Sequence, residues 1–422
     1  MYLSLMEKLQ NSSTHILSLA DRCVKCGLCL PQCPTYALSS NENESPRGRI
    51  ALVQGWLSGE LSLSPVLTKH LDQCLLCRRC ERVCPSQVAY GEIMDQSKAL
   101  ISQQTELSFS FKKIVTNINL KLALNKKILP TFIYTLRALQ KSGILNVARK
   151  SGLLKITGMQ RLTSYLPPLD KALKTKPFYP AANTKKGNVA LFTGCLSKQI
   201  DPKTVTASIK LLNLLGYGVY VPEQQVCCGA LHLHEGNKKD SIQFAEKNTS
   251  VFNQQKEITA IVSLVNGCTS QLREYTKLGV DEKFTHKVKD IVEFLAESDW
   301  PENIKIQPFD KKVALQIPCT LQNILRAEDK LVSLLNRIPK LTLNATYNKC
   351  CGAAGSYFLH QPQLSDQLKQ QAVNHLKQSL PDYIVSSNLG CALQLQSGLT
   401  LTKNKTKVIH PVVLLEQQLL VK

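Results

Sequence analysis

Hydrophobic residues in the second half of the chain alternate between two kinds of stretch. Short runs rich in β-branched residues, each ending in cysteine, are NVALFTGC (188–195), AIVSLVNGC (260–268), KVALQIPC (312–319) and DYIVSSNLGC (382–391). Such runs predict strands. The stretches TVTASIKLLNLLG (204–216) and LQNILRAEDKLVSLL (321–335) instead repeat their apolar residues every three or four positions, which predicts helices. Strands that alternate with helices predict α/β domains with parallel sheets.

The first half of the chain shows mainly the helical period. The segment IALVQGWLSGEL (50–61) has apolar residues at helical spacing. From Leu107 to Leu169, apolar and basic residues are interleaved, which predicts amphipathic helices broken at Pro130 and Gly143. We therefore expect an α+β multidomain chain: an α-helical N-terminal domain and a basic helical connector, followed by α/β domains.

Eight of the 16 cysteines lie in two runs of the form C-x2-C-x2-C-x3-C-P near the N-terminus. This is the bacterial ferredoxin run, in which three thiolates hold one [4Fe–4S] cluster and the fourth cysteine reaches the neighbouring cluster. We therefore expect two clusters with crossed fourth ligands. The predicted ligands are Cys23, Cys26, Cys29 and Cys84 for cluster 1, and Cys74, Cys77, Cys80 and Cys33 for cluster 2. Zinc is the alternative, although it does not explain two four-cysteine runs that each end in Cys-Pro.

The other eight cysteines form an internal repeat. A single cysteine, a Cys-Cys-Gly sequence and a second single cysteine occur twice at nearly the same spacing, about 123 residues apart. The two sets are Cys195, Cys227, Cys228 and Cys268, and Cys319, Cys350, Cys351 and Cys391. Ligand sites in parallel sheets lie beyond the carboxyl ends of the strands, so the four cysteines of each set should converge there. They are candidates for a further cluster or for redox thiols, and buried structural cysteine is the alternative.

Other polar residues near the cysteines have two readings each. Arg47 and Arg49, in the insert between the two ferredoxin runs, either offset cluster charge or form a solvated turn. His232, His234 and His360 follow the Cys-Cys-Gly loops. They either hydrogen-bond a cluster or relay a proton, or they are surface loop histidines, which we take as the default.

The net charge of +21 favours an anionic partner. Between Leu107 and Leu169 there are eleven Lys or Arg and no Asp or Glu, so this connector is predicted to dock on anionic lipid or on an acidic subunit. A solvated basic face is the alternative. Nucleic acid is not expected as a partner because no recognised binding motif accompanies the charge. No secretion signal or membrane-spanning run is recognisable, which predicts a cytoplasmic protein, peripheral at most to the inner membrane.

With these motifs in view, the chain resembles the iron–sulfur subunits of bacterial glycolate oxidase (glycolate dehydrogenase). The resemblance is carried by RCVKCGLCLPQCPTY, SPRGRI, HLDQCLLCRRCERVCPSQVAYGEIMD and VCCGALHLHEG. It implies a two-cluster ferredoxin domain (1–105), a basic helical connector (106–185) and two CCG domains (186–305 and 306–422). The fullest CCG motif ends in C-x2-C, whereas Gln271 and Gln394 stand at the last position here, which agrees best with the glycolate branch.

The resemblance implies an electron-transfer subunit that works with FAD-containing partner subunits and passes electrons towards a quinone-type acceptor. No G-x-G-x-x-G lies at a strand–helix junction, so the chain has no evident dinucleotide site and no catalytic residues of its own are predicted. We expect it to be inactive alone. The alternatives are an iron–sulfur subunit of a lactate, glycerol-3-phosphate or heterodisulfide-type oxidoreductase, or a redox-sensing interaction protein.

Overall fold

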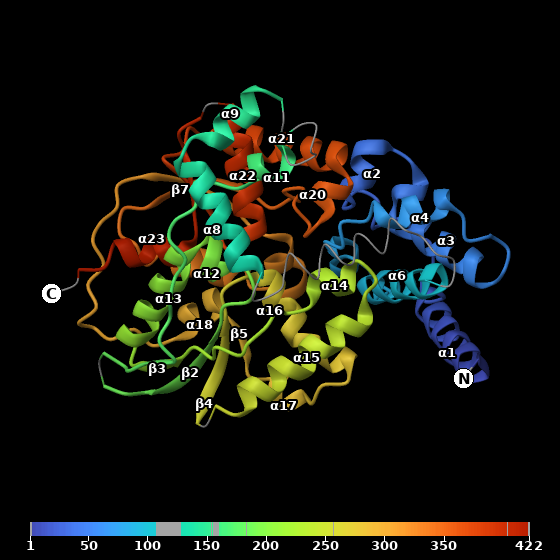
Figure 1. Ribbon diagram of the computed structural model, residues 1–422, viewed down its shortest axis with the longest axis horizontal. Helices are drawn as coiled ribbons and strands as arrows, with labels where there is room; N and C mark the ends of the chain where they lie inside the picture. The colour runs from blue at the N-terminus through green and yellow to red at the C-terminus, as the bar shows by residue number, and fades with distance from the viewer. Residues whose placement is uncertain are drawn as a thin grey trace.

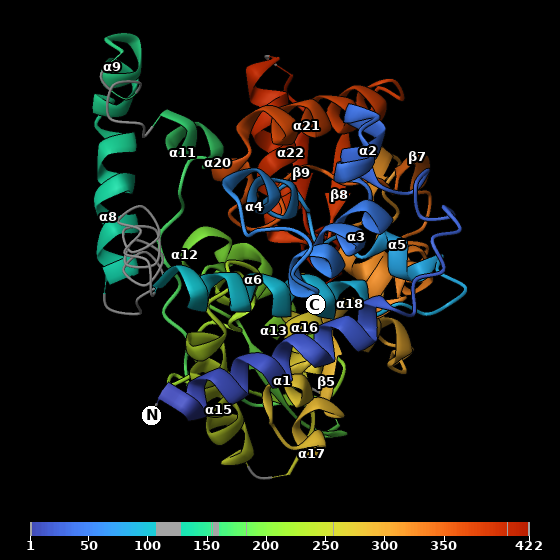
Figure 2. The same ribbon diagram turned by 90° about the vertical axis from the view of Figure 1, so that its right-hand side faces the viewer.

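The computed structural model describes residues 2–106, 128–152, 154, 160–182, 184–255, 257–402 and 404–420. Three parts follow one another along the chain (Figure 1): the blue and cyan N-terminal helices, a green helical segment, and two α/β units from yellow-green to red. Figure 2 looks at the N-terminal side and shows these first helices in front of both α/β units.

The N-terminal part is entirely helical among its described residues. Its elements are α1 (Tyr2–Ala20), α2 (Pro34–Ser39), η1 (Glu42–Glu44), α3 (Pro46–Leu57), α4 (Pro65–Asp72), α5 (Arg79–Arg82) and α6 (Tyr90–Glu106). Helices α3 and α4 begin with proline after a serine whose side chain accepts a hydrogen bond from the first turn, a favourable helix start. The helices predicted for the insert between the ferredoxin runs are confirmed. They enclose an apolar core with Ile50, Val53 and Leu71.

The connector contains three described helices: α8 (Ile128–Lys141), α9 (Ile144–Lys150) and α11 (Gln160–Tyr165). Gly143 has a left-handed backbone (φ 78°) and separates α8 from α9, as predicted. Pro130 lies inside α8 as described, so the helix is not broken there. Several predicted docking lysines, including Lys112, Lys113, Lys126 and Lys127, lie outside the described residues.

The first α/β unit, here called repeat 1, has a five-stranded sheet of order β1-β3-β2-β4-β5. All its neighbouring strands are parallel except β1, which pairs antiparallel with β3. The strands are β1 (Phe178–Tyr179), β2 (Gly187–Phe192), β3 (Tyr217–Tyr220), β4 (Ile258–Ser263) and β5 (Val288–Asp290). The helices are α12 (Ser197–Ile200), α13 (Pro202–Leu214), α14 (Ala230–His234), α15 (Lys238–Asn253), α16 (Asn266–Arg273), η2 (Tyr275–Leu278), α17 (Glu282–Thr285) and α18 (Ile291–Glu297).

The second unit, repeat 2, has the fully parallel sheet β7-β6-β8-β9. Its strands are β6 (Lys312–Gln316), β7 (Thr342–Tyr347), β8 (Tyr383–Ser386) and β9 (Lys407–Ile409). Its helices are η3 (Leu321–Leu325), α19 (Glu328–Leu335), α20 (Tyr357–His360), α21 (Pro362–Lys377), α22 (Leu389–Leu401) and α23 (Pro411–Gln417). The predicted parallel sheets are therefore confirmed, and the strand order matches that of β3-β2-β4-β5.

The prediction of one continuous helix in repeat 2 is wrong. Residues 321–335 form not one helix but the π-helical turn η3 and the α-helix α19. The break lies at Arg326, whose left-handed backbone (φ 53°) ends the first turn. The apolar period continues across the break, so the pattern alone does not reveal it.

The two repeats bury a common core. Helix α13 contacts α23, and α18 contacts α19, so the first helix of eight or more residues in each repeat packs on the last helix of the other. Buried residues of both sheets, such as Leu191 and Leu315, belong to the same apolar cluster. This reciprocal packing fixes the carboxyl ends of the two sheets relative to each other.

The N-terminal domain covers the elements that follow those carboxyl ends. Helix α6 contacts α14 of repeat 1, while α5 contacts η3 and α2 contacts α21 of repeat 2. Among the described residues, no helix combines the length and apolar character required to cross a membrane.

Candidate iron–sulfur site

The two ferredoxin runs fold into matching loops. In the first run, Lys25 and Gly27 have left-handed backbones (φ 54° and 87°), and in the second run Leu76 and Arg78 do (φ 49° and 54°). These residues flank the second cysteine of each run at equivalent positions. Left-handed residues between right-handed ones turn successive N–H groups to the same side and form nests that bind anions, including iron–sulfur centres. The loops and their thiols thus fit the group that the spacing predicts, one [4Fe–4S] cluster on each run.

The predicted ligands of cluster 2 lie close together. Cys33, Cys74 and Cys80 are buried. Burial, then the charges of Cys77 and Cys74, and more weakly that of Cys33, raise the pKa of the Cys80 thiol. The hydroxyl of Tyr90 donates a hydrogen bond to Sγ of Cys74 over 3.5 Å. Cys33 thus lies within the electrostatic reach of the second run, where the crossed-ligand scheme requires it.

The predicted ligands of cluster 1 lie nearer the surface. Cys23, Cys29 and Cys84 are partly buried and pack on the N-terminal core, while Cys26 is exposed. Burial raises the pKa of the Cys29 thiol, and the charges of Cys23 and Cys33 add to this. The apolar side chains of Val24 and Leu28, which flank Cys26 in the chain, are 69% and 58% exposed. The loop around Cys26 is therefore the place where the cluster 1 cysteines lie closest to the protein surface.

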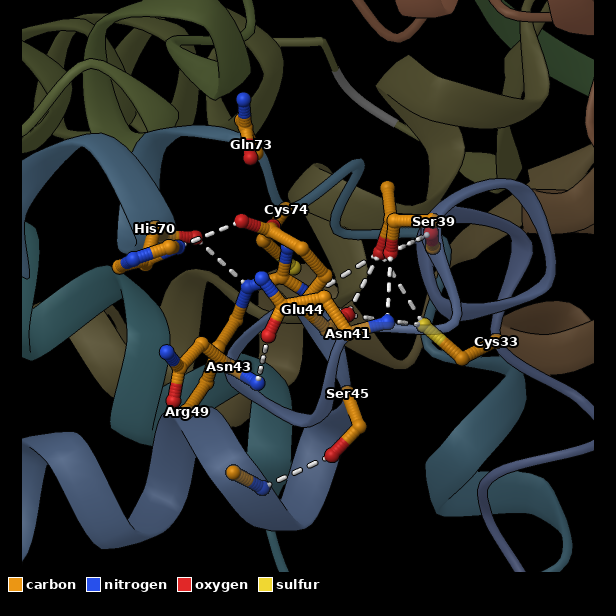
Figure 3. A network of polar contacts seen from close by, with 12 residues as sticks. Cys33, Ser39, Asn41, Asn43, Glu44, Ser45, Arg49, His70, Gln73 and Cys74 are labelled. Atoms are coloured by element: carbon orange, nitrogen blue, oxygen red, sulfur yellow. Dashed lines mark hydrogen bonds and ion pairs between the residues drawn. The ribbon is translucent and has the colours of Figure 1, made fainter.

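A buried ion pair supports the cluster 2 loop (Figure 3). Arg49 is 1% exposed, and its Nη2 lies 2.5 Å from Oε2 of Glu44. The other carboxylate oxygen of Glu44 lies 2.5 Å from Nδ1 of His70. Burial lowers the pKa of the Arg49 guanidinium, but the nearby negative charges outweigh burial and raise it. These charges come from Tyr90, Cys74, Cys33 and Glu44. The solvated-turn reading is thus wrong for Arg49, while the partly exposed Arg47 pairs with Glu42.

The loop of the second run is anchored on repeat 2. The side-chain amide of Asn323 donates to the carbonyl oxygen of Cys77 over 2.9 Å, and the Tyr357 hydroxyl donates to that of Gln73 over 3.1 Å. Leu75, Cys350 and Tyr357 share one buried apolar cluster, against which Cys77 packs. The predicted cluster 2 site therefore adjoins the cysteines of repeat 2.

The second run also carries several of the charged contacts between the domains. Arg78 reaches Glu274 of repeat 1 at 2.6 Å, and Arg82 reaches Glu328 of repeat 2 at the same distance. The guanidinium of Arg79 donates to the carbonyl of Asn348. These three arginines stand between or just after the cysteines, and nothing in the local sequence indicates their partners.

Repeat 1 gathers its four cysteines beyond β2, β3 and β4. Hydrogen bonds from the Cys195 and Cys228 thiols lower the pKa of the Cys227 thiol. The loop is held by buried polar groups. The Asn248 amide donates to the Cys227 carbonyl over 2.9 Å, and the Tyr275 hydroxyl donates to that of Cys228 over 3.0 Å. Asn248 and Tyr275 were not singled out from the sequence, because they come from later elements.

Repeat 2 repeats the arrangement beyond β6, β7 and β8. The Sγ atoms of Cys351 and Cys391 lie 2.9 Å apart, and both are free thiols. A hydrogen bond with Cys350 and burial both raise the pKa of the Cys319 thiol. One expectation needs correction: Cys268 and Cys391 are not strand ends but lie in the first turns of α16 and α22. A helix start directs the backbone N–H groups of that turn beyond the helix end.

The glutamines at the position of the missing fifth cysteine behave differently. In repeat 2, Nε2 of Gln394 donates to the Ser365 hydroxyl over 2.9 Å, and that hydroxyl donates to the Gly352 carbonyl over 2.8 Å. In repeat 1, Nε2 of Gln271 is buried without a hydrogen-bond partner among the described residues. The two repeats thus differ in the hydrogen bonds made by the glutamine next to each thiol site.

The three histidines that follow the Cys-Cys-Gly loops differ in burial and in their partners. His234 pairs with Asp95 of α6 at 2.9 Å, and His360 lies 4.0 Å from Glu235, so both are interdomain or surface groups. His232 is 0% exposed, which overturns the expectation that it is a surface loop residue. No group of three His, Cys, Asp or Glu side chains in the described part converges on a point suited to a single metal ion.

The comparisons with known proteins agree with this geometry. The model described as a 4Fe–4S dicluster domain matches residues 19–88, and the model described as a cysteine-rich domain matches residues 189–273 and 313–396. A probable glycolate oxidase iron–sulfur subunit of Bacillus subtilis (strain 168) is 30% identical over 425 residues, 96% of each chain. This chain belongs to the family of glycolate oxidase iron–sulfur subunits. The resemblance drawn from the motifs is confirmed.

Other relatives define how far the similarity extends. The glycolate oxidase iron–sulfur subunit of Escherichia coli (strain K12) is 30% identical over 414 residues, 95% of each chain. Lactate utilization protein A of Shouchella clausii (strain KSM-K16) is 25% identical over 233 residues, which is 53% of this chain and 96% of that protein. The dicluster match implies two [4Fe–4S] clusters in this family member, on the N-terminal cysteine runs.

Proposed function

We propose that this chain is the electron-transfer subunit of a flavin-dependent glycolate dehydrogenase, which converts glycolate to glyoxylate. Hydride removal takes place on FAD-containing partner subunits, because the organic chemistry belongs to the flavin. The chain then carries electrons towards a quinone-type acceptor. Glycolate is assigned because relatives named for glycolate oxidase match nearly the whole chain, while the lactate-utilisation relative matches about half of it.

The contact between Cys77 and repeat 2 is the observation that carries an electron-transfer role. Cys77 packs on the same buried cluster as Cys350, so two thiol sites adjoin within one dry interior. Burial, followed by the charge of Cys319, raises the pKa of Cys77 to well above its ordinary range. Such contact between thiol sites suits a redox relay, in which electrons pass between neighbouring centres.

Each proposed ligand set has a part in this relay. When bound, the two [4Fe–4S] clusters supply one-electron transfer. Cys23, Cys26, Cys29 and Cys84 hold cluster 1, and Cys74, Cys77, Cys80 and Cys33 hold cluster 2. The eight cysteines of the repeats hold a further centre, with Cys319, Cys350, Cys351 and Cys391 nearest to cluster 2. The buried Arg49 guanidinium provides positive charge beside Cys33 and Cys74.

Two surfaces are assigned to partners. The exposed loop around Cys26, with Val24 and Leu28, faces a partner protein, because it brings thiols and apolar side chains to the same place. The connector docks on an acidic subunit or an anionic membrane surface on the cytoplasmic side. Its described helices α8 and α9 expose Tyr134 and Val147 at 70% and 68%. Apolar side chains on a basic helix are typical of such docking.

Reconstitution tests the proposal. The chain and the flavoproteins that co-purify with it are assayed separately and together with glycolate, lactate and glycerol 3-phosphate, using a quinone analogue as acceptor. We expect glycolate-dependent reduction of the acceptor only when both are present. Glycolate oxidation by the purified chain alone would overturn the electron-carrier assignment. A preference for lactate or glycerol 3-phosphate would overturn the substrate.

A further inference from the structure

The two ferredoxin runs differ in how they contact the repeats. In the second run, Arg78 reaches Glu274 of repeat 1 at 2.6 Å, and Arg82 reaches Glu328 of repeat 2 at the same distance. The described residues show no hydrogen bond or ion pair between the first run, residues 23–33, and either repeat. One of the two proposed cluster loops is thus bonded to both repeats, while the other is bonded only within the N-terminal domain.

Backbone hydrogen bonds and apolar packing show the same difference between the runs. The Asn323 amide of repeat 2 donates to the carbonyl oxygen of Cys77 over 2.9 Å. Leu75 is 7% exposed and shares a buried cluster with Tyr357 of repeat 2. Val24, which follows the first cysteine of its run as Leu75 does, is 69% exposed. The same position of the loop is therefore buried against a repeat in one run and open in the other.

The backbone of the second loop needs support from its surroundings. Both of its left-handed residues, Leu76 and Arg78, carry side chains, whereas the first run has Lys25 and Gly27 at these places. A side chain disfavours the left-handed region, so such a residue remains there only when neighbouring groups hold it. Two sets of groups are available to the second loop: the cysteines of its metal site and the partners in the repeats. Each set should therefore help the other to form.

We propose that occupancy of the second run by cluster 2 stabilises the contact between the N-terminal domain and both repeats, whereas occupancy of the first run by cluster 1 does not. The proposal rests on the assignment of cluster 2 to the second run. Binding at a metal site is coupled to the folded arrangement of the segments that supply its ligands. The coupling is reciprocal, so partners in the repeats that hold the loop also favour retention of cluster 2. The second run thus has a role in domain assembly in addition to electron transfer.

Hydrogen exchange of the anaerobically purified full chain, read by mass spectrometry, tests the first half of this coupling. Cys80→Ser disrupts the second run. Cys29→Ser is the matched control, because each is the third cysteine of its run and both pack in the N-terminal core. In Cys80→Ser we expect peptides with η3 and α20, whose Asn323 and Tyr357 bond to the loop, to exchange about tenfold faster. Cys29→Ser should leave them at the parent rate, and β8, inside repeat 2, should be unchanged in both. Equal exchange of η3 and α20 in the two variants would overturn the proposal.

A second variant tests the reverse direction and keeps every residue of both runs, should Cys80→Ser fail to fold. Glu274→Gln combined with Glu328→Gln removes the charged partners in the repeats. We expect this variant to lose cluster 2 to a ferrous iron chelator about tenfold faster than the parent chain, with cluster 1 unaffected. Glu297→Gln combined with Glu416→Gln is the control, because these carboxylates pair with lysines of the repeats and not with the N-terminal domain. Loss of cluster 2 at the same rate in the variant, the control and the parent chain would overturn the proposal.

Both measurements are made without flavoprotein partners or substrate, which separates this inference from the proposed function. A parent chain that carries no iron on the second run would overturn the assignment of cluster 2 and, with it, the coupling. A chain that holds cluster 2 but shows neither effect would overturn only the coupling. The electron-transfer role would then still stand, and its failure in reconstitution would be needed to overturn it.

Discussion

The side-chain amide of Asn323 in repeat 2 donates a 2.9 Å hydrogen bond to the backbone carbonyl of Cys77 in the N-terminal domain. The bond joins a residue of the π-helical turn η3 to one of the proposed ligands of cluster 2. The carbonyl belongs to a residue whose thiol is a proposed ligand, so the bond ties the loop of the second run to repeat 2. The interface between the domains is thus part of the redox site.

Asn323→Ala should weaken this contact and slow turnover without removing a cluster. A hydrogen bond of this kind contributes about 1 kcal/mol, and the partly buried carbonyl of Cys77 would be left without this partner. Turnover with the flavoprotein partners, iron content and the spectrum of cluster 2 are measured. Asn344→Ala is the control, since its amide also donates to a carbonyl, that of Ser379, but away from the interface. Equal loss of turnover in the two variants would contradict a specific role of the Cys77 contact.

Metal analysis should find about eight iron ions and about eight sulfides per chain from the N-terminal clusters alone. The reason is the pair of cysteine runs, each folded into a loop with left-handed residues at equivalent positions. Any centre in the repeats adds to this number. Anaerobic purification followed by iron, sulfide and zinc determination makes the measurement. Stoichiometric zinc with negligible sulfide would be incompatible with the dicluster assignment.

Cys33→Ser should damage cluster 2 and spare cluster 1, although Cys33 stands in the first run. Cys33 is buried and acts electrostatically on Cys77 and Cys80 of the second run as well as on Cys29 of its own, so its position allows either assignment and the variant decides between them. Spectra of the reduced variant are compared with those of Cys77→Ser and Cys26→Ser. A spectrum that matches Cys77→Ser agrees with the sharing, and one that matches Cys26→Ser refutes it.

Arg49→Met should destabilise the N-terminal domain and lower the potential of cluster 2. Removal of Arg49 leaves the buried carboxylate of Glu44 without its main counter-charge, which typically costs about 3–5 kcal/mol. It also removes positive charge beside Cys33 and Cys74. Denaturant unfolding and redox titration measure the two effects. The double variant Arg49→Met with Glu44→Gln removes both charges, so it should recover part of the stability and part of the potential. An unchanged potential in Arg49→Met alone would show that the guanidinium charge does not act on cluster 2.

The sequence contains the repeating features of this molecule but few of the contacts between them. Spacing indicated the two ferredoxin loops, and the alternation of strands and helices predicted both parallel sheets. These features are local, because neighbouring residues in the chain determine them. The break at Arg326 was missed because the apolar period continues through it. The first-turn placement of Cys268 and Cys391 was missed because the strand runs were extended through the turn-type residues before them, Asn266-Gly267 and Asn388 to Gly390.

The support of the site could not be predicted, because it depends on partners distant in the chain. Asn248 and Tyr275 hold the Cys-Cys-Gly loop of repeat 1 from two later elements. Glu44, whose carboxylate pairs with Arg49 and His70, belongs to no recognisable sequence motif. His232 was noticed, yet only the folded chain shows that it is buried while His234, two residues on, faces Asp95. Burial of a helical residue depends on which face packs, and α14 is too short to show that face in its sequence.

The two repeats should respond differently to loss of an equivalent cysteine. Cys350 shares a buried cluster with Leu75 and Tyr357, and Cys77 packs against it, so Cys350→Ser should alter the signal of cluster 2. Cys227 instead lies in the interior cluster of repeat 1 with Phe252 and Tyr275, so Cys227→Ser should leave both N-terminal signals intact. Both variants should impair turnover with the flavoprotein partners if both repeats take part in the relay. Spectra of the reduced proteins, recorded at matched iron content, make the comparison. An unchanged cluster 2 signal in Cys350→Ser would show that the contact with Cys77 has no electronic consequence, and normal turnover in both variants would show that the cysteines of the repeats are structural.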